Sequence, residues 1–396
     1  MKKGGCDMIR VKKGLLVSCC CLSLLFTTGC WDRVEIEDTG LVIGVALDNM
    51  EDERHTPQFT LQYVVPSVLA GEKGGGQELP FHNVSIQESS LFEGGRTHST
   101  VTSRSPNYAH LKVLVISKKF ARSINLLQLL NFFFRDHEIR RTVHVLISEE
   151  DASEILDIKG GIEPIPALTL YSISEHMETK TGKMPPVSTL GDFSEKMSSN
   201  SSVMIQKVKA INGGVQVIGT AIIKGHTHKM IGELNDEETF GINLVTGEAK
   251  AGAITGKDDR TDQIITYEID NLRSRIVPKV KGEEISFNVN IDTEGRLSED
   301  WIESSDAFDE KFIQKAEEQI KKEIKRMIES GLMKTQQDLR VDVAGFGDSL
   351  RIHHPKMWKK IKEDWEERFV DTEIDTKVNV HIRQFQTQGR KINKQE

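Results

Sequence analysis

The stretch that decides the fold is residues 110–148, HLKVLVISKKFARSINLLQLLNFFFRDHEIRRTVHVLIS. Continuous apolar runs at 110–117 and 142–148 are typical of fully buried strands. The residues between them carry helical apolar spacing and predict a helix over 118–134, with its apolar face at Phe120, Ile124, Leu127 and Leu130. A strand, a helix and a strand of this length predict a parallel pair with a right-handed crossover. This part of the chain is therefore expected to be α/β or α+β.

Two more strands are predicted upstream of that unit. Residues 41–47 form a continuous apolar run, and residues 59–65 alternate between apolar and polar side chains. An N-terminal α/β domain is therefore expected over residues 30–195. A stretch rich in Pro, Ser and Gly at 184–202 predicts the boundary that follows it.

A small strand-rich middle domain is expected over residues 203–262. Its strands are predicted from short apolar runs at 203–211, 215–225 and 229–234. The first two runs flank Asn-Gly-Gly at 212–214, and Asn-Gly between apolar runs is a strong hairpin signal.

A C-terminal α+β domain is expected over residues 263–390, followed by a polar tail at 391–396. Its predicted elements are a half-buried strand at 285–291, a long amphipathic helix at 306–330 with Gly331 as the C′ residue, a strand at 339–347, a helix that begins at Pro355, and a final alternating strand at 374–382. The whole chain is thus expected to form three mixed-sheet domains of the α+β or mixed α/β class.

Composition and charge limit the function. The chain has 396 residues, of which 37% are hydrophobic and 28% charged, so it can bury packed cores in two or three domains. Residues 1–29 contain five basic residues and one acidic residue, a charge of +4. The whole chain carries −8, so the residues after 29 carry −12. An acidic body argues against a nucleic-acid partner, because phosphates require a basic face.

All five cysteines lie within the first thirty residues, in a segment typical of an export signal. Basic residues lead into an apolar stretch at 15–26, which is too short to span a bilayer, and small residues follow it up to Cys30. Residues 1–29 resemble a bacterial lipoprotein signal peptide, although Thr27 stands where Leu is usual. Translation from Met8 instead of Met1 would still supply a basic segment.

By this resemblance Cys30 is the lipidation site and the first mature residue. It would carry a diacylglyceryl thioether, and two acyl chains anchor a protein stably where one holds it only marginally. The alternative is an ordinary cysteine behind an uncleaved amphipathic leader. If the signal is removed, the mature chain can form no disulfide and must depend on core packing.

No pattern in the sequence amounts to an active site. His226 with His228, and His353 with His354, could ligate a metal, but no HExxH, CxxC or carboxylate cluster accompanies them, so exposed turn histidines are expected. His110, His137 and His144 lie around the strand–helix–strand unit without a GxSxG nucleophile, and structural roles are expected for them. We therefore predict no catalytic residue, no metal and no cofactor.

Two charged or aromatic features have more than one interpretation. Residues 135–141, RDHEIRR, are a ligand clamp, a solvated helix end or part of a partner interface. Trp358 and Trp365 lie on one predicted helical face, and core packing explains that spacing better than a binding surface does.

Taken together, several segments resemble the Ger(x)C family, the C subunits of nutrient germinant receptors in endospore-forming bacteria. The resemblance is carried in order by residues 30–33, 35–38, 110–112, 134–140, 219–221, 232–234 and 342–347, by Trp358 and Trp365, and by the final strand. It covers essentially the whole chain after residue 29, and the basic tail after Gly389 departs from it.

The resemblance implies a non-enzymatic subunit, lipid-anchored on the outer face of the inner spore membrane, with three domains in an elongated arrangement. Its partners would be the A and B subunits of the receptor, and direct binding of the nutrient by this subunit stays open. A lipid-anchored solute-binding protein that captures a nutrient is the alternative function. An anchored hydrolase is a third, for which the sequence offers no acid, base or nucleophile set.

Overall fold

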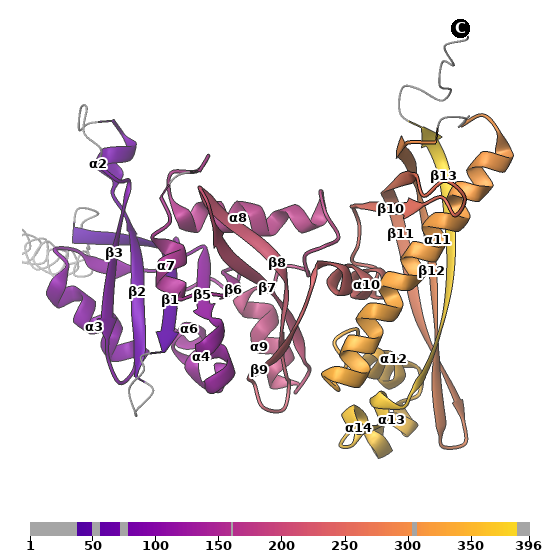
Figure 1. The fold of residues 1–396 in the computed structure, drawn as a ribbon. Helices are drawn as coiled ribbons and strands as arrows, with labels where there is room; N and C mark the ends of the chain where they lie inside the picture. Colours follow the sequence, from indigo (N-terminus) through magenta and orange to yellow (C-terminus); the bar gives the residue numbers. More distant parts are fainter. Residues whose placement is uncertain (1–37, 50–55, 72–77, 160, 303–306, 386–396) are drawn as a thin grey trace, which may run out of the picture.

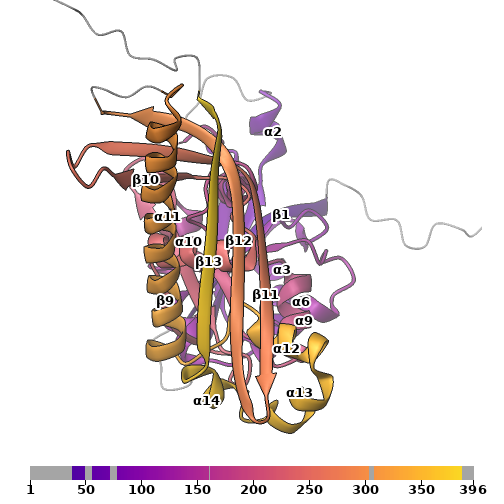
Figure 2. The same cartoon turned by 90° about the vertical axis from the view of Figure 1, so that its right-hand side faces the viewer.

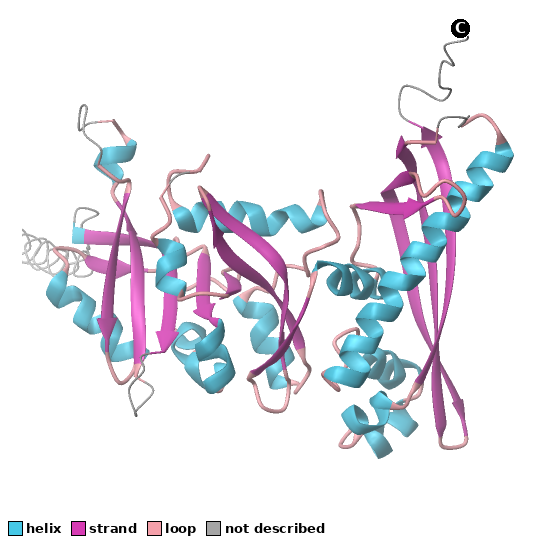
Figure 3. Ribbon diagram, in the orientation of Figure 1, coloured by secondary structure: helices cyan, strands magenta, loops and turns pink. Residues whose placement is uncertain are grey.

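The computed structural model of the chain describes residues 38–49, 56–71, 78–159, 161–302 and 307–385. The described residues form an elongated molecule in which two β-sheets lie at opposite ends and helices pack around them (Figure 1). Figure 3 shows that helices and strands alternate along most of the molecule, so the predicted mixed α/β class is confirmed.

The first sheet contains nine strands in the order β3-β2-β1-β5-β6-β7-β8-β9, with β4 beside β1. Its strands are β1 (Thr39–Asn49), β2 (Pro57–Val64), β3 (Phe81–Gln87), β4 (Ser105–Asn107), β5 (Val113–Ser117), β6 (His144–Ser148), β7 (Val203–Ile211), β8 (Gly214–Ile223) and β9 (Met230–Leu234). The predicted parallel pair is present, because β5 and β6 pair in parallel from Val113 and His144 onward. All five residues of each of these two strands are buried, as their continuous apolar runs required.

Helices cover both faces of the first sheet (Figure 3). They are α2 (Pro66–Leu69), α3 (Leu91–Val101), α4 (Lys118–Ser123), α5 (Leu126–Leu129), α6 (Asn131–Arg135), α7 (Ala152–Leu156), α8 (Pro166–Ser174), the 3-10 helix η2 (Glu175–Glu178) and α9 (Leu190–Ser198). One face packs on α3 to α6 and α9, and the other packs on α7 and α8.

The single helix predicted over 118–134 is wrong, because the structure has three short helices there. Ile124 ends α4 in an extended conformation, and the side chain of Asn125 then caps α5 by accepting a hydrogen bond from the N–H of Gln128. An Asn that bonds its own backbone favours a helix start over a helix interior. The apolar residues still face the sheet, since Phe120 and Leu126 are fully buried.

The stretch at 184–202, where a domain boundary is expected, contains the capped helix α9. In α9 the Thr189 hydroxyl accepts from the N–H of Asp192, and the Asp192 carboxylate accepts from the N–H of Thr189. This reciprocal capping box fixes the helix start. Leu190, Phe193 and Met197 are then buried in the core, so this stretch belongs to the packed body.

The second sheet has four strands in the order β10-β11-β12-β13. They are β10 (Ala253–Lys257), β11 (Ile264–Lys281), β12 (Glu284–Asp300) and β13 (Glu373–Phe385). The long β11–β12 hairpin turns at Gly282, which has φ +64°, and β13 pairs in parallel with β12. The helix α11 (Glu310–Met333), continued by the π-helical turn η3 (Lys334–Asp338), runs alongside these strands (Figure 2).

The segment expected as a separate middle domain is divided between the two sheets. Strands β7 to β9 extend the first sheet, because β6 pairs with β7 through Ile147 and Lys207. Strand β10 belongs to the second sheet. The helix α10 (Asp236–Thr246) lies between the sheets and connects them in the chain (Figure 1). The three-domain division stays a prediction.

Two glycines let α10 and α11 approach closely. A methyl group on Gly241 of α10 would overlap the carbonyl of Met327, and one on Gly331 of α11 would come within 2.7 Å of the carbonyl oxygen of Glu238. Gly331 was expected to end its helix as the C′ residue, and that prediction is wrong: α11 continues to Met333. The glycine is needed for helix contact and not for termination.

Residues 339–347 do not form the predicted strand. The carboxylate of Asp342 accepts hydrogen bonds from the N–H groups of Gly345, Phe346 and Gly347, and Gly345 has φ +82°. These bonds hold an irregular loop that starts α12 (Phe346–His353).

The one helix expected from Pro355 is two helices, α13 (Pro355–Ile361) and α14 (Trp365–Val370). Trp365 is buried and its indole N–H donates to Asp342 at 3.0 Å, while Trp358 packs half-buried against the same core. The prediction that both tryptophans are core residues is confirmed.

Replacement of Gly241 by Ala should test the α10–α11 contact. The added methyl group overlaps backbone that cannot move by a rotamer change, so we expect a loss of about 2 kcal/mol in the free energy of unfolding. Urea denaturation measures it. Gly214→Ala is the control, because no atom lies within 4 Å of its added methyl group. Equal stability of the two variants would contradict the close contact.

Candidate functional site

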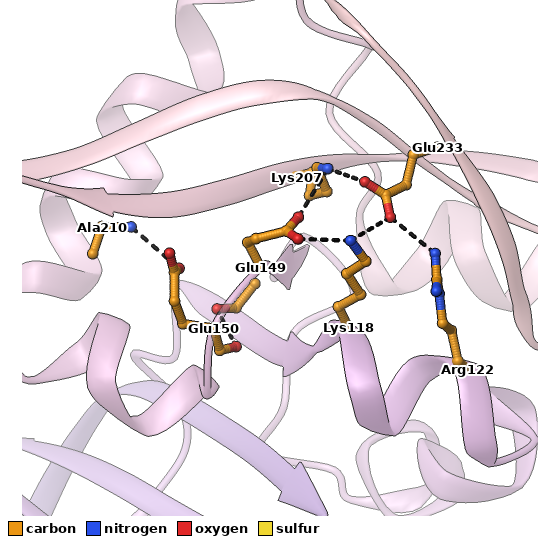
Figure 4. Close-up of polar contacts among 8 residues, drawn as sticks. Lys118, Arg122, Glu149, Glu150, Lys207, Ala210 and Glu233 are labelled. Atoms are coloured by element: carbon orange, nitrogen blue, oxygen red, sulfur yellow. Dashed lines mark hydrogen bonds and ion pairs between the residues drawn. The ribbon is translucent and has the colours of Figure 1, made fainter.

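Five charged side chains meet on the first sheet and form what we call the ion-pair cluster: Lys118, Arg122, Glu149, Lys207 and Glu233 (Figure 4). Lys118 and Glu149 are the first residues after the parallel strands β5 and β6, so the carboxyl ends of neighbouring strands bring them together. Lys207 and Glu233 come from β7 and β9.

Each carboxylate of the cluster lies between cations. Glu149 is 2.6 Å from the Lys118 amine and 2.9 Å from that of Lys207. Glu233 also contacts Lys207, and it is 2.6 Å from Lys118 and 3.0 Å from Arg122. The Lys207 side chain is only 9% exposed, so its charge depends on these two partners.

The contacts within the cluster favour the charged forms of Glu149, Glu233 and Lys118. Burial alone would raise the pKa of Glu149 and Glu233, but hydrogen bonds from Lys118 and Lys207 outweigh it and lower both values. Burial likewise disfavours the charged form of Lys118, and its bonds to the two glutamates raise its pKa instead. The cluster joins α4, β7 and β9 through these ion pairs.

A groove of about 990 Å³ lies on the same side of the first sheet, between α3 and the α5–α6 segment. Its apolar lining includes Leu91, Phe92, Ile124, Leu129 and Phe132. Phe92 is 59% exposed, and its ring lies 6.5 Å from that of Phe132.

The rim of the groove is charged. Residues 135–137, which belong to the RDHEIRR run, line it together with Arg96. The Arg96 guanidinium lies 5.3 Å from the ring centre of Phe92, and neither Arg96 nor Arg135 has an ion pair with a described residue. Arg135 is the last residue of α6 and is exposed, so all three interpretations of the run stay open.

His144, Ser174 and Glu175 resemble a catalytic triad in composition but not in function. The Nδ1 of His144 is 2.7 Å from the Ser174 hydroxyl, which donates its only proton to the Tyr171 carbonyl at 2.7 Å. The histidine must therefore donate to the serine and cannot accept its proton. Ser174 is also fully buried, and burial together with Lys112 lowers the pKa of His144 to about 4. The structural role predicted for His144 is confirmed.

The other predicted histidines are not brought together. His110, His137 and His226 are exposed. His228 is half-buried and bonds Asn125 and the Met197 carbonyl, each at 3.2 Å, so it is not the exposed turn residue that was expected.

His353 contacts the Ser349 carbonyl at 2.8 Å, and His354 caps the end of α12. Among the described residues, no group of three or more His, Cys, Asp or Glu side chains is arranged to hold a metal.

The predicted lipidation site, Cys30, lies outside the described residues, as do the signal at 1–29 and the tail at 391–396. None of the described helices is both long enough and apolar enough to cross a bilayer.

Comparison with known proteins covers nearly the whole chain. A family model described as Spore germination protein N-terminal domain matches residues 32–210, and one described as Spore germination B3/GerAC like, C-terminal, matches residues 218–386. Spore germination protein YndF of Bacillus subtilis (strain 168) is 37% identical over 93% of this chain and 95% of its own length. The chain belongs to the Ger(x)C family.

Two further relatives also match this chain over nearly its whole length. Spore germination protein A3 of Bacillus subtilis (strain 168) is 31% identical over 94% of this chain and 98% of its own. Spore germination protein B3 of the same organism is 29% identical over 93% and 96%. Among solved structures, the crystal structure of the GerBC protein superposes with a TM-score of 0.59 at 25% identity, over 87% of this chain and 99% of that one. The fold described above is therefore a Ger(x)C fold.

Sequence reasoning missed two features of this Ger(x)C protein. The ion-pair cluster was missed because its members are up to 115 positions apart, although Lys207 inside an apolar strand was a visible signal. The groove was missed because α3 was not predicted; Ser90 before Leu91, with Glu93 three residues after Ser90, is a helix-start signal.

Replacement of Glu233 by Gln should test the cluster. The variant leaves the buried Lys207 with one carboxylate, and we expect a loss of about 2 kcal/mol in unfolding free energy at pH 7. Because the folded-state pKa of Glu233 lies below the ordinary glutamate value of 4.5, its contribution is present above pH 4.5 and is lost as the pH falls through the folded value.

Urea denaturation between pH 7 and pH 3 measures both effects of Glu233→Gln, whose deficit should shrink below pH 4.5. The control is Glu363→Gln, whose side chain is 82% exposed and should change little. A deficit that stays constant across this range would show that the charge of Glu233 is not what stabilises the fold.

Proposed function

We propose that this chain is the lipid-anchored C subunit of a nutrient germinant receptor. A diacylglyceryl group on Cys30 would hold it on the outer face of the inner spore membrane, where it would act with the A and B subunits. Its role would be in receptor assembly or signalling. The observation that carries the proposal is the similarity to spore germination proteins A3 and B3 over more than nine-tenths of the chain.

The geometry of the described residues supports a subunit without catalysis of its own. In the triad-like set at His144 the serine is buried and donates its proton to a carbonyl, and in the ion-pair cluster both carboxylates are paired with cations. What the surface offers is an apolar groove with a charged rim, which suits binding more than chemistry.

Replacement of Cys30 by Ala tests the anchor. The variant has no thiol to acylate, so we expect it to leave the spore membrane fraction, with impaired germination in nutrients and normal germination with non-nutrient triggers. Cell fractionation and germination assays measure this. Cys21→Ala is the matched control, because that residue would be removed with the signal. A Cys30→Ala protein that stays in the membrane and germinates normally would contradict the proposal.

The alternative function, capture of a nutrient, is favoured by one observation. The groove volume of about 990 Å³ lies at the upper end of small-molecule sites, which measure roughly 300–1,000 Å³. The two unlike sheets argue against it, since capture between domains usually employs two similar lobes.

Titration calorimetry of the purified full chain with amino acids and sugars separates the two functions. A subunit without its own nutrient site should give no heat of binding. Saturable binding of one nutrient, abolished by Phe132→Ala in the groove, would favour the solute-binding function instead. Gly214→Ala, far from any neighbouring atom, serves as the folded control.

A further inference from the structure

The groove between α3 and the α5–α6 segment presents an exposed apolar side chain and two arginines that have no ion pair with a described residue. Phe92 exposes 59% of its surface on α3, and an exposed aromatic ring beside other apolar side chains is typical of an interaction surface. Arg96 and Arg135 have no ion pair with a described residue. Asp136 also lines the rim, so Arg96, Arg135 and Asp136 together carry a charge of +1. An apolar occupant with acidic groups fits this lining.

The groove extends from Pro57, which is opposite the last residue of β1, toward the segment that follows β4 and lies beside the first residues of β1. Strand β4, which follows α3, pairs with the first residues of β1, so that Asn107 is opposite Leu41. The next residue, Tyr108, lies 5.9 Å from the groove residue Phe132 between ring centres, and its N–H donates to Glu138 at 3.1 Å. One end of the groove, at Phe132, therefore adjoins the segment that pairs with the first residues of β1.

The segment that leads into β1 has the required chemistry. Residues 31–38 read WDRVEIED and contain four carboxylates, one guanidinium and three large apolar side chains, at Trp31, Val34 and Ile36. The segment carries a charge of −3, and the groove rim contains Arg96 and Arg135, for which the described residues provide no ion pair. The charges are complementary, and the apolar side chains match the lining of the groove.

The segment is also long enough. Seven residues, 31–37, extend by up to about 25 Å, while the eleven residues of α3 rise about 16 Å. Because the segment is joined covalently to β1, its local concentration at the groove is on the order of millimolar, so weak contacts suffice to hold it.

We propose that residues 31–38 dock in the groove between α3 and α5–α6. Their apolar side chains cover Phe92 and Phe132, and their carboxylates pair with Arg96 and Arg135. A second copy of the chain and a lipid surface are the competing occupants, and the experiment below separates them.

If the proposed function is correct, the docking also determines how the protein is oriented on the membrane. Only this orientation rests on the proposed function. If Cys30 is acylated, a docked segment holds the bilayer surface beside α3 and so fixes which end of the molecule faces the membrane. The docking itself needs no acyl chain and is tested separately from it.

Hydrogen–deuterium exchange of the full chain, purified in detergent, tests the docking. We expect amides 32–38 to exchange about tenfold faster in an Arg96→Glu/Arg135→Glu variant than in the unaltered chain, because two ion pairs become repulsive contacts. The matched control is Arg273→Glu/Arg275→Glu, which reverses two exposed arginines on β11 and should leave these amides unchanged. Unchanged exchange of the buried β5 amides in both variants establishes that they are folded.

A charge swap provides the second variant. Glu35→Arg/Glu37→Arg, placed in the Arg96→Glu/Arg135→Glu background, should restore slow exchange of amides 32–38 and of α3. Cys30→Ala in the otherwise unaltered chain should keep the protection, so loss of the anchor and loss of docking are distinguishable.

Three results would overturn the proposal. Amides 32–38 that exchange at the unstructured rate in the unaltered chain show that the segment is not docked. Protection of α3 that rises with chain concentration assigns the groove to a second copy. Protection of α3 that appears only with added phosphatidylglycerol vesicles assigns it to a lipid surface.

Discussion

Between the two sheets, α10 and α11 cross in backbone contact at Gly241 and Gly331. The sheets share no strand among the described residues, so helices must join them. Residues 239–245 of α10 are all buried, which is typical of a helix packed on every side. Both glycines remove the side chain that would separate the helix axes, and the apolar residues of β8, β11 and α11 can then pack as one core.

Charged groups follow two different patterns in this protein. In the ion-pair cluster each buried or half-buried charge has its partners, so the cluster stabilises the sheet and offers nothing to a ligand. At the groove, Arg96 and Arg135 lie beside exposed apolar surface, and within the described part of the chain neither has an ion pair.

The sequence predicted those elements whose apolar pattern is local. Strands β5 to β9 and the alternating strand β13 are present, and so is α11, whose face from Ala316 to Ile328 is buried. The failures at 118–134 and 339–347 arise where Asn125 and Asp342 bond nearby backbone and override the apolar pattern. The family resemblance was sound because its motifs extend over the whole chain. The groove and the cluster combine residues distant in sequence, and no local pattern could place them together.

The parallel pairing of β13 with β12 has a consequence for how the chain folds. Strand β12 ends at Asp300 and β13 begins at Glu373, so the second sheet closes only across a crossover that contains α11 to α14. Contacts of such long sequence separation form slowly, because the closure entropy of the loop must be overcome first. Until β13 pairs with β12, the backbone N–H and C=O groups on that edge of β12 are unpaired and can bond to other chains. Truncation before Glu373 should therefore produce aggregation and not merely a shorter folded protein.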